Sequence, residues 1–595
     1  MSPDKSPQSW TLPERVAYVV SHSYPYSSNG YAGRSHQIAR ALHQAGHQVI
    51  VFNRPGRPWH IEGFAQSKKV PLDQTIDGVR YIFLPMTASP ATSLEHQLSR
   101  SETLLAEAFE VFRPAIVLAA SNWETAEPAR RAAKRQGRAF FYEQRGFWEM
   151  SRGFRDPDFA KSDAYWQHRR RDTEVAQLAQ GVFTLNNAMA EELIARGVPA
   201  VKIHIVANGI AQPAPHKPIS LRDIGCTAAR LLGYIGSLSD YEGCADLLHL
   251  LARLRGPDPQ NPVQDVALMI VGSSAPSGLI SSQAAPSQEA ALHALAQRLG
   301  ISAHVHFIKQ MPESQIGGYY RLCDVILLPR HATPVTVLVP PLKPYTAAGY
   351  GVPVVMSDLP PLAEISNEIK ALLFTPGDIE AMAAAVLQTL RATTSDLQDA
   401  PSVPENLALE NLAWAQRIRP MLRLFASVTA AERLRNTRLI PAAHLGSLTT
   451  TTQPERPFDT LALPLVGLQA QLGAQTLACL GPGLDLRDGG RFISLTRQNI
   501  LEVMATTEPG RFVIDWVGLQ AGGDMGEWAG LWSTDAMRLN RQVMDACRIA
   551  LDRGWRLVVT GPVNRAEAPL FRTVAGVLEE QGPLGLNALR AKDTA

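Results

Sequence analysis

Short apolar runs alternate with amphipathic stretches along most of the chain. Val16–Val20 and Ala115–Ala120 are apolar on both faces, whereas Gly33–Ala45 and Thr125–Gln136 carry apolar residues at helical spacing. Strands that are apolar on both faces and separated by helices favour a parallel sheet that is covered on both sides. The strands predicted for this first sheet are Val16–Val20, Gln48–Phe52, Tyr81–Leu84, Ala115–Ala120, Ala139–Tyr142, Val182–Leu185 and His204–Val206.

The same alternation resumes after a proline-rich break at Ala211–Ser220. A second parallel sheet is therefore predicted, and Asn406–Phe425 is predicted to be one helix that packs back on the first domain. Two such domains in tandem leave a cleft, and ligands of open α/β sheets bind beyond the carboxyl ends of the strands. The strands predicted for the second sheet are Leu231–Ile235, Val266–Val271, His304–Ile308, Asp324–Leu328, Val352–Met356 and Ala371–Phe374.

A third, smaller βα unit follows a stretch rich in Thr, Ser and Pro, which is typical of a linker. Its one long helix is predicted over Asp535–Asp552, and we expect the unit to be a separate domain that the linker tethers. Its predicted strands are Thr476–Leu480, Arg491–Leu495, Arg511–Trp516 and Arg556–Thr560. The fold class is α/β, with predicted boundaries at 15–211 and 219–435 for the two larger lobes, 436–457 for the linker and 458–595 for the small domain.

Composition limits the function classes that this architecture can serve. The net charge of +2 over 595 residues gives no electrostatic case for nucleic acid as a partner. The five cysteines are far apart, which favours unpaired thiols in a reducing compartment. The polar N-terminus is unlike a signal peptide, and no stretch is uniformly apolar enough for a membrane helix. We therefore expect a cytoplasmic protein, with the inner face of the membrane as a second location.

The first candidate site is a glycine-bearing turn after strand Val16–Val20. Gly30 and Gly33 would let the backbone approach a ligand closely, and the helix that begins near Arg34 would offer its N–H groups to a phosphate. An ordinary βα turn explains the same residues, and on the local signal alone it is favoured. The nearby His43 and His47 have the spacing of a zinc pair, but no acidic third ligand is close, so no metal site is predicted.

Two further candidates lie at strand ends. Arg145 and Trp148 follow the strand Ala139–Tyr142, where Arg145 could hold an anion and Trp148 could stack on a sugar; a surface loop with an Arg–Glu pair is an equal alternative. Arg330 ends a strand and Lys343 precedes a helix. Two cations at one cleft edge suit a pyrophosphate, although solvated surface charge is the commoner role of any one of them.

Taken together, these segments resemble the family 4 glycosyltransferases, in the same order along the chain. The resemblance covers roughly 15–425, and Val352–Ile365 is the closest match. It implies the GT-B fold, with an acceptor-side and a donor-side Rossmann-like lobe. It also implies retaining transfer from a nucleotide-diphosphate sugar, with no bound metal or cofactor. The other matching segments are Gly30–His36, Ala45–Val49, Tyr142–Glu149, Asn208–Ile210, Gly233–Leu238, Tyr241–Gly243, Pro329–Arg330 and Leu342–Pro344.

The resemblance also implies site roles. Gly30, Gly33 and Arg34 would lie near the diphosphate or the acceptor, and Arg145 and Trp148 would face the acceptor. Gly236 belongs to the donor-side match, and Arg330 and Lys343 would hold the diphosphate. Thr346 and Glu364 would lie near the donor nucleoside and sugar.

The chain departs from the family at the donor site. The family has two glutamates here that hold the donor's hydroxyls, whereas this chain has Thr346 in one place and apolar Val337 or Leu338 in the other. Losing a charge-assisted hydrogen bond costs about 1.5–3 kcal/mol. Further departures are Ala207, Ala211, Lys309 and Pro340.

The resemblance predicts a transferase that moves a hexose to a glycan or lipid-linked glycan acceptor in bacterial surface polysaccharide assembly, with peripheral membrane contact among its expected interactions. The donor-site departures favour an alternative, an inactive homologue that binds a glycan or a partner transferase. A third class with this architecture is a sugar-nucleotide epimerase. In the small C-terminal unit, four segments resemble the N-terminal lobe of spore-coat and teichoic-type glycosyltransferases: Leu480–Leu486, Phe492–Thr496, Phe512–Trp516 and Gly526–Gly530. The match covers about 100 residues and lacks their donor lobe.

Overall fold

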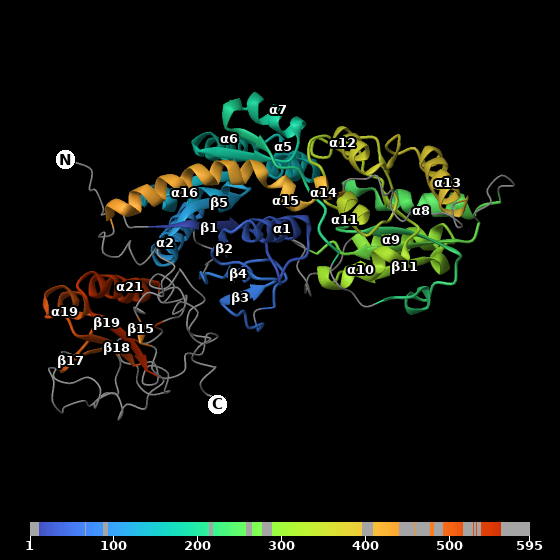
Figure 1. Ribbon diagram of the computed structural model, residues 1–595. Helices are drawn as coiled ribbons and strands as arrows, with labels where there is room; N and C mark the ends of the chain where they lie inside the picture. The colour runs from blue at the N-terminus through green and yellow to red at the C-terminus, as the bar shows by residue number, and fades with distance from the viewer. Residues whose placement is uncertain are drawn as a thin grey trace.

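The computed structural model describes residues 11–65, 67–86, 93–213, 218–257, 264–275, 288–395, 409–439, 458–459, 477–480, 492–515, 528, 531 and 537–560. Two large lobes lie side by side, and a smaller unit lies beneath the first of them (Figure 1). Each contains its own sheet, so the predicted α/β architecture of two parallel-sheet lobes is confirmed.

The first lobe has an eight-stranded sheet in the order β3-β4-β2-β1-β5-β6-β7-β8. Every pairing is parallel except that of β3 with β4. Its strands are β1 Leu12–Val20, β2 Gln48–Asn53, β3 Asp73–Ile76, β4 Val79–Ile82, β5 Pro114–Ala120, β6 Ala139–Glu143, β7 Gly181–Thr184 and β8 Ile203–Ile205. Its helices are α1 Gly30–Gln44, α2 Leu94–Phe112, α3 Trp123–Arg135, α4 Trp148–Arg155, α5 Pro157–Ala160, α6 Asp163–Leu178 and α7 Asn187–Ala195, with the 3-10 turn η1 Ala200–Lys202.

The second lobe has a six-stranded, fully parallel sheet in the order β11-β10-β9-β12-β13-β14. Its strands are β9 Arg230–Ile235, β10 Val266–Gly272, β11 Val305–Lys309, β12 Val325–Leu328, β13 Val354–Ser357 and β14 Leu372–Phe374. Its helices are α8 Cys244–Arg255, α9 Gln288–Arg298, α10 Glu313–Leu322, α11 Lys343–Gly349, α12 Pro360–Ile369 and α13 Ile379–Ser395, with 3-10 turns η2 Leu221–Ile224, η3 Asp240–Glu242 and η5 Ser302–His304.

Helix α1 begins earlier than predicted. Its first residue is Gly30 rather than a residue near Arg34, because Asn29 caps the helix by accepting a hydrogen bond from the Ala32 N–H. Gly30 and Gly33 therefore lie in the first turns of a helix rather than in a loop.

The predicted helix Asn406–Phe425 is wrong as a single element. The described chain forms α14 Leu409–Leu412, α15 Trp414–Arg417 and α16 Arg419–Leu439 instead. Ala413 is extended and pairs with Ile210, which interrupts the helix where the chain returns from the second lobe to the first.

Helix α16 runs across the first lobe, next to β1 and β5 (Figure 1). Met421 and Phe425 are fully buried in that lobe's core. The helix also continues through the first residues of the predicted linker, up to Leu439. Residues 440–457 lie outside the described part of the chain.

The third unit has a five-stranded parallel sheet in the order β15-β19-β18-β16-β17. Its helix α21 packs against α2 of the first lobe, and one apolar cluster includes buried residues of both parts. The unit is thus docked on the first lobe as well as joined to it by the chain. Its elements are β15 Phe458–Asp459, β16 Leu477–Leu480, β17 Phe492–Ser494, α19 Ile500–Thr506, β18 Arg511–Asp515, α21 Met537–Asp552 and β19 Arg556–Thr560.

Most of the segment 526–530, which carried part of the third unit's resemblance, lies outside the described residues. Of this segment only Trp528 is described; it is buried and donates to the Leu495 carbonyl at 3.1 Å. Residues 561–595 also lie outside the described part.

Hydrogen bonds join the two large lobes across the cleft. At one end, Gln310 donates to the Ser28 carbonyl at 2.7 Å, and the Ser28 hydroxyl donates to the Met311 carbonyl at 3.3 Å. At the other, Asn186 donates to the Leu338 carbonyl at 3.0 Å, and Asn208 donates to the Pro340 carbonyl at 3.3 Å. The lobes are therefore in direct contact at both ends of the cleft.

Candidate functional site

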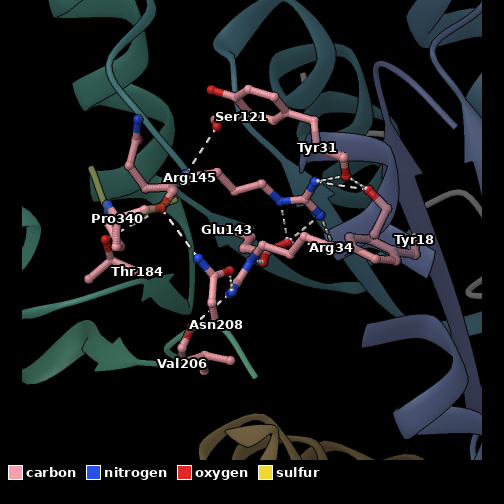
Figure 2. Close-up of polar contacts among 12 residues, drawn as sticks. Tyr18, Tyr31, Arg34, Ser121, Glu143, Arg145, Thr184, Val206, Asn208 and Pro340 are labelled. Carbon is pink, nitrogen blue, oxygen red and sulfur yellow. Dashed lines mark hydrogen bonds and ion pairs between the residues drawn. The ribbon is translucent and has the colours of Figure 1, made fainter. Parts of the chain in front are cut away.

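A buried carboxylate, Glu143, lies between Arg34 and Arg145 in the first lobe (Figure 2). Its two oxygens accept from Arg34 Nε at 2.8 Å and from Arg145 at 2.7 and 2.9 Å. Tyr18 of β1 contacts both Glu143 and Arg145 through its hydroxyl. Burial would raise the pKa of Glu143, but Arg145 and Arg34 outweigh it and lower that pKa to about 2. The carboxylate is therefore ionised at neutral pH.

Every N–H group of the Arg145 guanidinium already donates a hydrogen bond within the protein. Besides Glu143 and Tyr18, its guanidinium donates to the Tyr31 carbonyl at 3.0 Å and to the Ser35 hydroxyl at 2.8 Å. The residue is only 4% exposed. The structure thus places Arg145 inside the lobe, where it joins β1, α1 and the end of β6, rather than facing an acceptor as expected.

Arg34 is also turned inward. It donates to Asn208 Oδ1 at 2.9 Å and to the Val206 carbonyl at 2.7 Å, in the segment that leads to the second lobe. Asn208 in turn donates to Pro340 of that lobe, as Figure 2 shows. Arg34 therefore positions the interlobe connection.

The other predicted residues of the first lobe differ in accessibility. A Cβ at Gly30 would meet no atom within 4 Å, so this end of α1 is open, whereas Gly33 is buried within the helix. Trp148 packs against His168, with ring centroids 4.4 Å apart, and against Phe159 at 5.8 Å. Since other side chains contact its ring, Trp148 is half-buried rather than fully presented to the cleft.

The two cations predicted for the second lobe do converge, but on a third side chain. Arg330 donates to Glu242 at 2.8 and 3.2 Å, and the Lys343 ammonium lies 2.7 Å from the same carboxylate. Lys343 also donates to the Tyr234 hydroxyl at 2.8 Å. Gly236 makes room for it, because a Cβ at that position would lie 1.9 Å from Lys343 Cε.

Sequence reasoning missed Glu242 as a site residue. It ends the short turn η3, and its side chain is 3% exposed. Burial would raise the pKa of Glu242, but Arg330 and Lys343 lower it to about 2. The only signal in the sequence was its place in the matching segment Tyr241–Gly243. Glu242, Arg330 and Lys343, here called the donor-lobe triad, carry a net charge of +1 rather than +2.

Thr346 and Val337, where the resemblance predicted glutamates, make only internal contacts. The Thr346 hydroxyl donates to the Leu342 carbonyl at 3.3 Å within α11, and Val337 packs among apolar residues. Glu364 lines a pocket of about 190 Å³ between the lobes. Burial, followed by the charge of Glu368, raises the pKa of Glu364. The pocket is lined by Leu185, Asn186, Asn187, Ile205, Ala207, Asn208, Pro340, Tyr345, Pro361, Glu364, Ile365, Glu368 and Arg417.

No group of three or more His, Cys, Asp or Glu side chains in the described part of the chain is arranged to hold a metal ion. No helix in the same residues has the length and apolar character needed to cross a bilayer.

Comparison with known proteins assigns both lobes. Residues 29–209 match the glycosyl transferase 4-like domain, and residues 229–392 match the glycosyl transferases group 1. The chain is 26% identical to a D-inositol 3-phosphate glycosyltransferase of Corynebacterium urealyticum over 202 residues, which are 34% of this chain but only 44% of that relative. It is 23% identical to a glycogen synthase of Mycobacterium tuberculosis over 443 residues, 72% of this chain and 98% of that protein.

A solved structure supports the fold. The sucrose-phosphate synthase of Thermosynechococcus elongatus superposes with a TM-score of 0.52 at 17% identity, covering 70% of this chain and 99% of that one. At this identity the likeness concerns the fold alone. It leaves the substrates open.

Proposed function

Because the chain belongs to the family 4 glycosyltransferases of the GT-B fold, we propose that it transfers a hexose from a nucleotide-diphosphate sugar to a glycan in bacterial surface polysaccharide assembly. The acceptor in this proposal is a glycan or lipid-linked glycan, met by peripheral contact at the inner face of the membrane. No resident metal or cofactor takes part.

The donor-lobe triad is the observation that carries the proposal. Arg330 and Lys343 come from different elements and hold one carboxylate at 2.7–2.8 Å. Two cations that converge on one carboxylate in this way also suit the oxygens of a diphosphate. When the bond from the sugar to the diphosphate breaks, negative charge develops on the leaving diphosphate, and fixed cations nearby stabilise it.

Glu242 has two opposing effects in this scheme. It fixes the two cations in place before a donor arrives, which reduces the reorganisation needed on binding. It also competes with the donor, because a diphosphate must either displace the carboxylate or bind beside it. Donor binding is therefore expected to be weaker than two unpaired cations would give.

The inactive homologue is the second candidate, and a specific observation favours it. The Thr346 hydroxyl is bonded to the backbone, and the neighbouring Val337 is apolar. Hydroxyls of a donor sugar buried here would lack the partners that two glutamates supply, at about 1–3 kcal/mol for each unsatisfied group.

Calorimetric titration with UDP and GDP tests the diphosphate site directly. We expect binding by the parent protein and a loss of at least tenfold in affinity in the double variant Arg330→Ala/Lys343→Ala. Arg298→Ala removes an exposed arginine of α9 and is the matched control. Unchanged affinity in the double variant, or no binding by the parent, would overturn the assignment. Release of nucleotide diphosphate from UDP- and GDP-hexoses then separates a transferase from an inactive homologue.

A further inference from the structure

A second hollow, of about 170 Å³, lies in the first lobe away from the donor-lobe triad. It is formed where β2 ends, by the turn that follows Asn53 and by the first turns of α2. Carboxyl ends of parallel strands are where ligands of such sheets bind. The hollow is lined by Arg54, Pro55, Arg57, His60, Met86, Gln97, Leu98 and Ser101, and is here called the Arg57 pocket.

Arg57 lacks an ionic partner among the described residues. Its neighbour Arg54 pairs with Glu124 at 2.7 Å, whereas no hydrogen bond or ion pair involves the Arg57 side chain within the described ranges. Residues 87–92, which continue the chain from Met86, contain no acidic residue. Burial, and then the charge of Arg54, lower the pKa of Arg57 to about 10, which leaves it charged at neutral pH. Glu124 also acts on Arg57 electrostatically, but it already pairs with Arg54, so the two arginines share one carboxylate and the pocket keeps one net positive charge.

Polar groups with unused hydrogen-bonding capacity lie in this part of the lobe: Ser101 lines the pocket, and His22 and Asn53 lie outside its lining. The buried Ser101 hydroxyl points to Met86 Sδ at 3.6 Å, which is a weak acceptor. His22 Nε2 and Asn53 Oδ1 are buried without a partner in the described structure. Arg57 and Arg54 contribute, after burial, to the low pKa of His22, so this ring lies within their electrostatic reach. Buried polar atoms without partners are uncommon and are often completed by water or a ligand.

The size of the pocket indicates what can enter it. Sites for whole small molecules are commonly about 300–1,000 Å³, so a pocket of about 170 Å³ suits a single charged group better than a complete sugar nucleotide. A guanidinium presents a planar fork of donors that matches phosphate and carboxylate oxygens.

We infer that the Arg57 pocket binds an oxyanion, the phosphate or carboxylate of an acceptor, with Arg57 as its cation and Ser101 as a neutral donor. That the molecule carrying this oxyanion is the acceptor rests on the proposed function. In that function the acceptor binds to the lobe opposite the donor-lobe triad, and the pocket lies in that lobe. The binding of the anion itself does not depend on that function. The acceptor class is accordingly an anionic glycan or a phosphate-bearing sugar or lipid.

Thermal-shift titration of the full chain with inorganic phosphate, at constant ionic strength, tests the inference. We expect phosphate to raise the melting temperature of the parent, and Arg57→Gln to weaken the apparent affinity at least tenfold. Arg57→Lys keeps the charge and should retain part of the response, and Arg298→Ala should retain all of it. The melting temperature of each variant without phosphate checks that it folds. No response in the parent, or an undiminished response in Arg57→Gln, overturns the inference.

Two further arms identify the source of the anion and separate the two proposals. Titration with a soluble hexose phosphate and with a polyprenyl phosphate in detergent micelles shows whether a sugar or a lipid carries it. Arg57→Gln should leave UDP affinity unchanged, because Arg57 is not part of the donor-lobe triad. Phosphate binding that depends on Arg57, in a protein that neither binds nor turns over a donor, would support the pocket and refute the proposed function.

Discussion

The Lys343 ammonium and the Glu242 carboxylate form a buried ion pair at 2.7 Å, with side chains only 15% and 3% exposed. The pair occupies the part of the donor lobe where the proposed function needs a cation free to meet a diphosphate. An internal carboxylate thus pairs with the cation that the proposed function assigns to the diphosphate.

Glu242→Gln should tighten UDP binding about tenfold or more, because the triad's net charge rises from +1 to +2 and its internal competitor is lost. The same variant should be less stable without ligand, since two buried cations lose their carboxylate. Calorimetric titration and thermal unfolding measure the two effects. Glu380→Gln, which breaks an exposed pair with Arg253, is the control and should change neither. Equal or weaker UDP binding by Glu242→Gln would contradict the competitor role.

The acid stability of the protein should depend on Glu143. Its pKa falls from an ordinary 4.5 to about 2 on folding. A depressed folded-state pKa contributes stability that is fully present above the unfolded value and is lost as pH falls toward the folded value. The difference in unfolding free energy between the parent and Glu143→Gln should therefore be constant above about pH 5 and shrink between 4.5 and 2. Urea unfolding at a series of pH values measures it. A difference that stays constant down to pH 3 would show that folding does not lower the pKa of Glu143.

Arg145→Lys should mainly destabilise the fold rather than weaken ligand binding. An ammonium cannot reproduce the planar set of donors that joins Glu143, Tyr18, Tyr31 and Ser35. We expect the unfolding free energy to fall by about 3 kcal/mol, as for a broken buried pair. The exposed Arg155→Lys should change it by less than about 0.5 kcal/mol. If Arg145→Lys keeps full stability but loses affinity for glycan acceptors, the side chain faces the acceptor after all.

Turnover of common UDP- and GDP-hexoses should be weak. Thr346 and the apolar Val337 leave donor hydroxyls unsatisfied, and Thr346→Glu alone should restore activity only in part because the Val337 side stays apolar. Release of nucleotide diphosphate, measured by chromatography, checks this. Turnover of about 1 per second or faster by the unmodified protein would mean that the substitutions mark a different donor rather than lost catalysis.

The third unit should stabilise the first lobe through α2. Arg113 is 1% exposed and donates to Asp545 of α21 at 3.2 Å. Asp545→Asn should lower the unfolding free energy by about 1–2 kcal/mol, whereas the exposed Glu502→Gln of α19 should have no measurable effect.

Limited proteolysis complements this test. Cleavage within residues 440–457 should leave the two large lobes folded, with a melting temperature lowered by a few degrees once α21 no longer covers α2. If cleavage unfolds the whole chain, the third unit is integral to the fold of the lobes.

Most strands could be predicted from the sequence because they are buried on both faces, and such strands appear as continuous apolar runs. Strand β3, one of two that were not predicted, has the sequence Asp-Gln-Thr-Ile and lies at the sheet edge, so it has no apolar run to reveal it. The break in the predicted helix Asn406–Phe425 also left no local signal, because it arises from the pairing of Ala413 with Ile210, a residue far away in the chain.

The site residues could be predicted only in part, because some of their partners come from distant parts of the chain. Strand ends and helix starts predicted that Arg330 and Lys343 would meet. The carboxylate between them could not be foreseen, because Glu242 is 88 residues from Arg330 and reaches it only through the packing of the lobe. Arg145 was correctly placed at a strand end, but the inward direction of its side chain depends on Tyr18 and Ser35 from other elements.

The hydrogen bonds that Ser28, Asn186 and Asn208 form across the cleft have a kinetic consequence. If each contributes about 1 kcal/mol, a conformer in which all four are broken is populated at roughly 0.1%. A ligand that binds only to this conformer has its apparent affinity reduced by that fraction. Its arrival then waits on the opening of the lobes rather than on diffusion, so association rates should level off as ligand concentration rises.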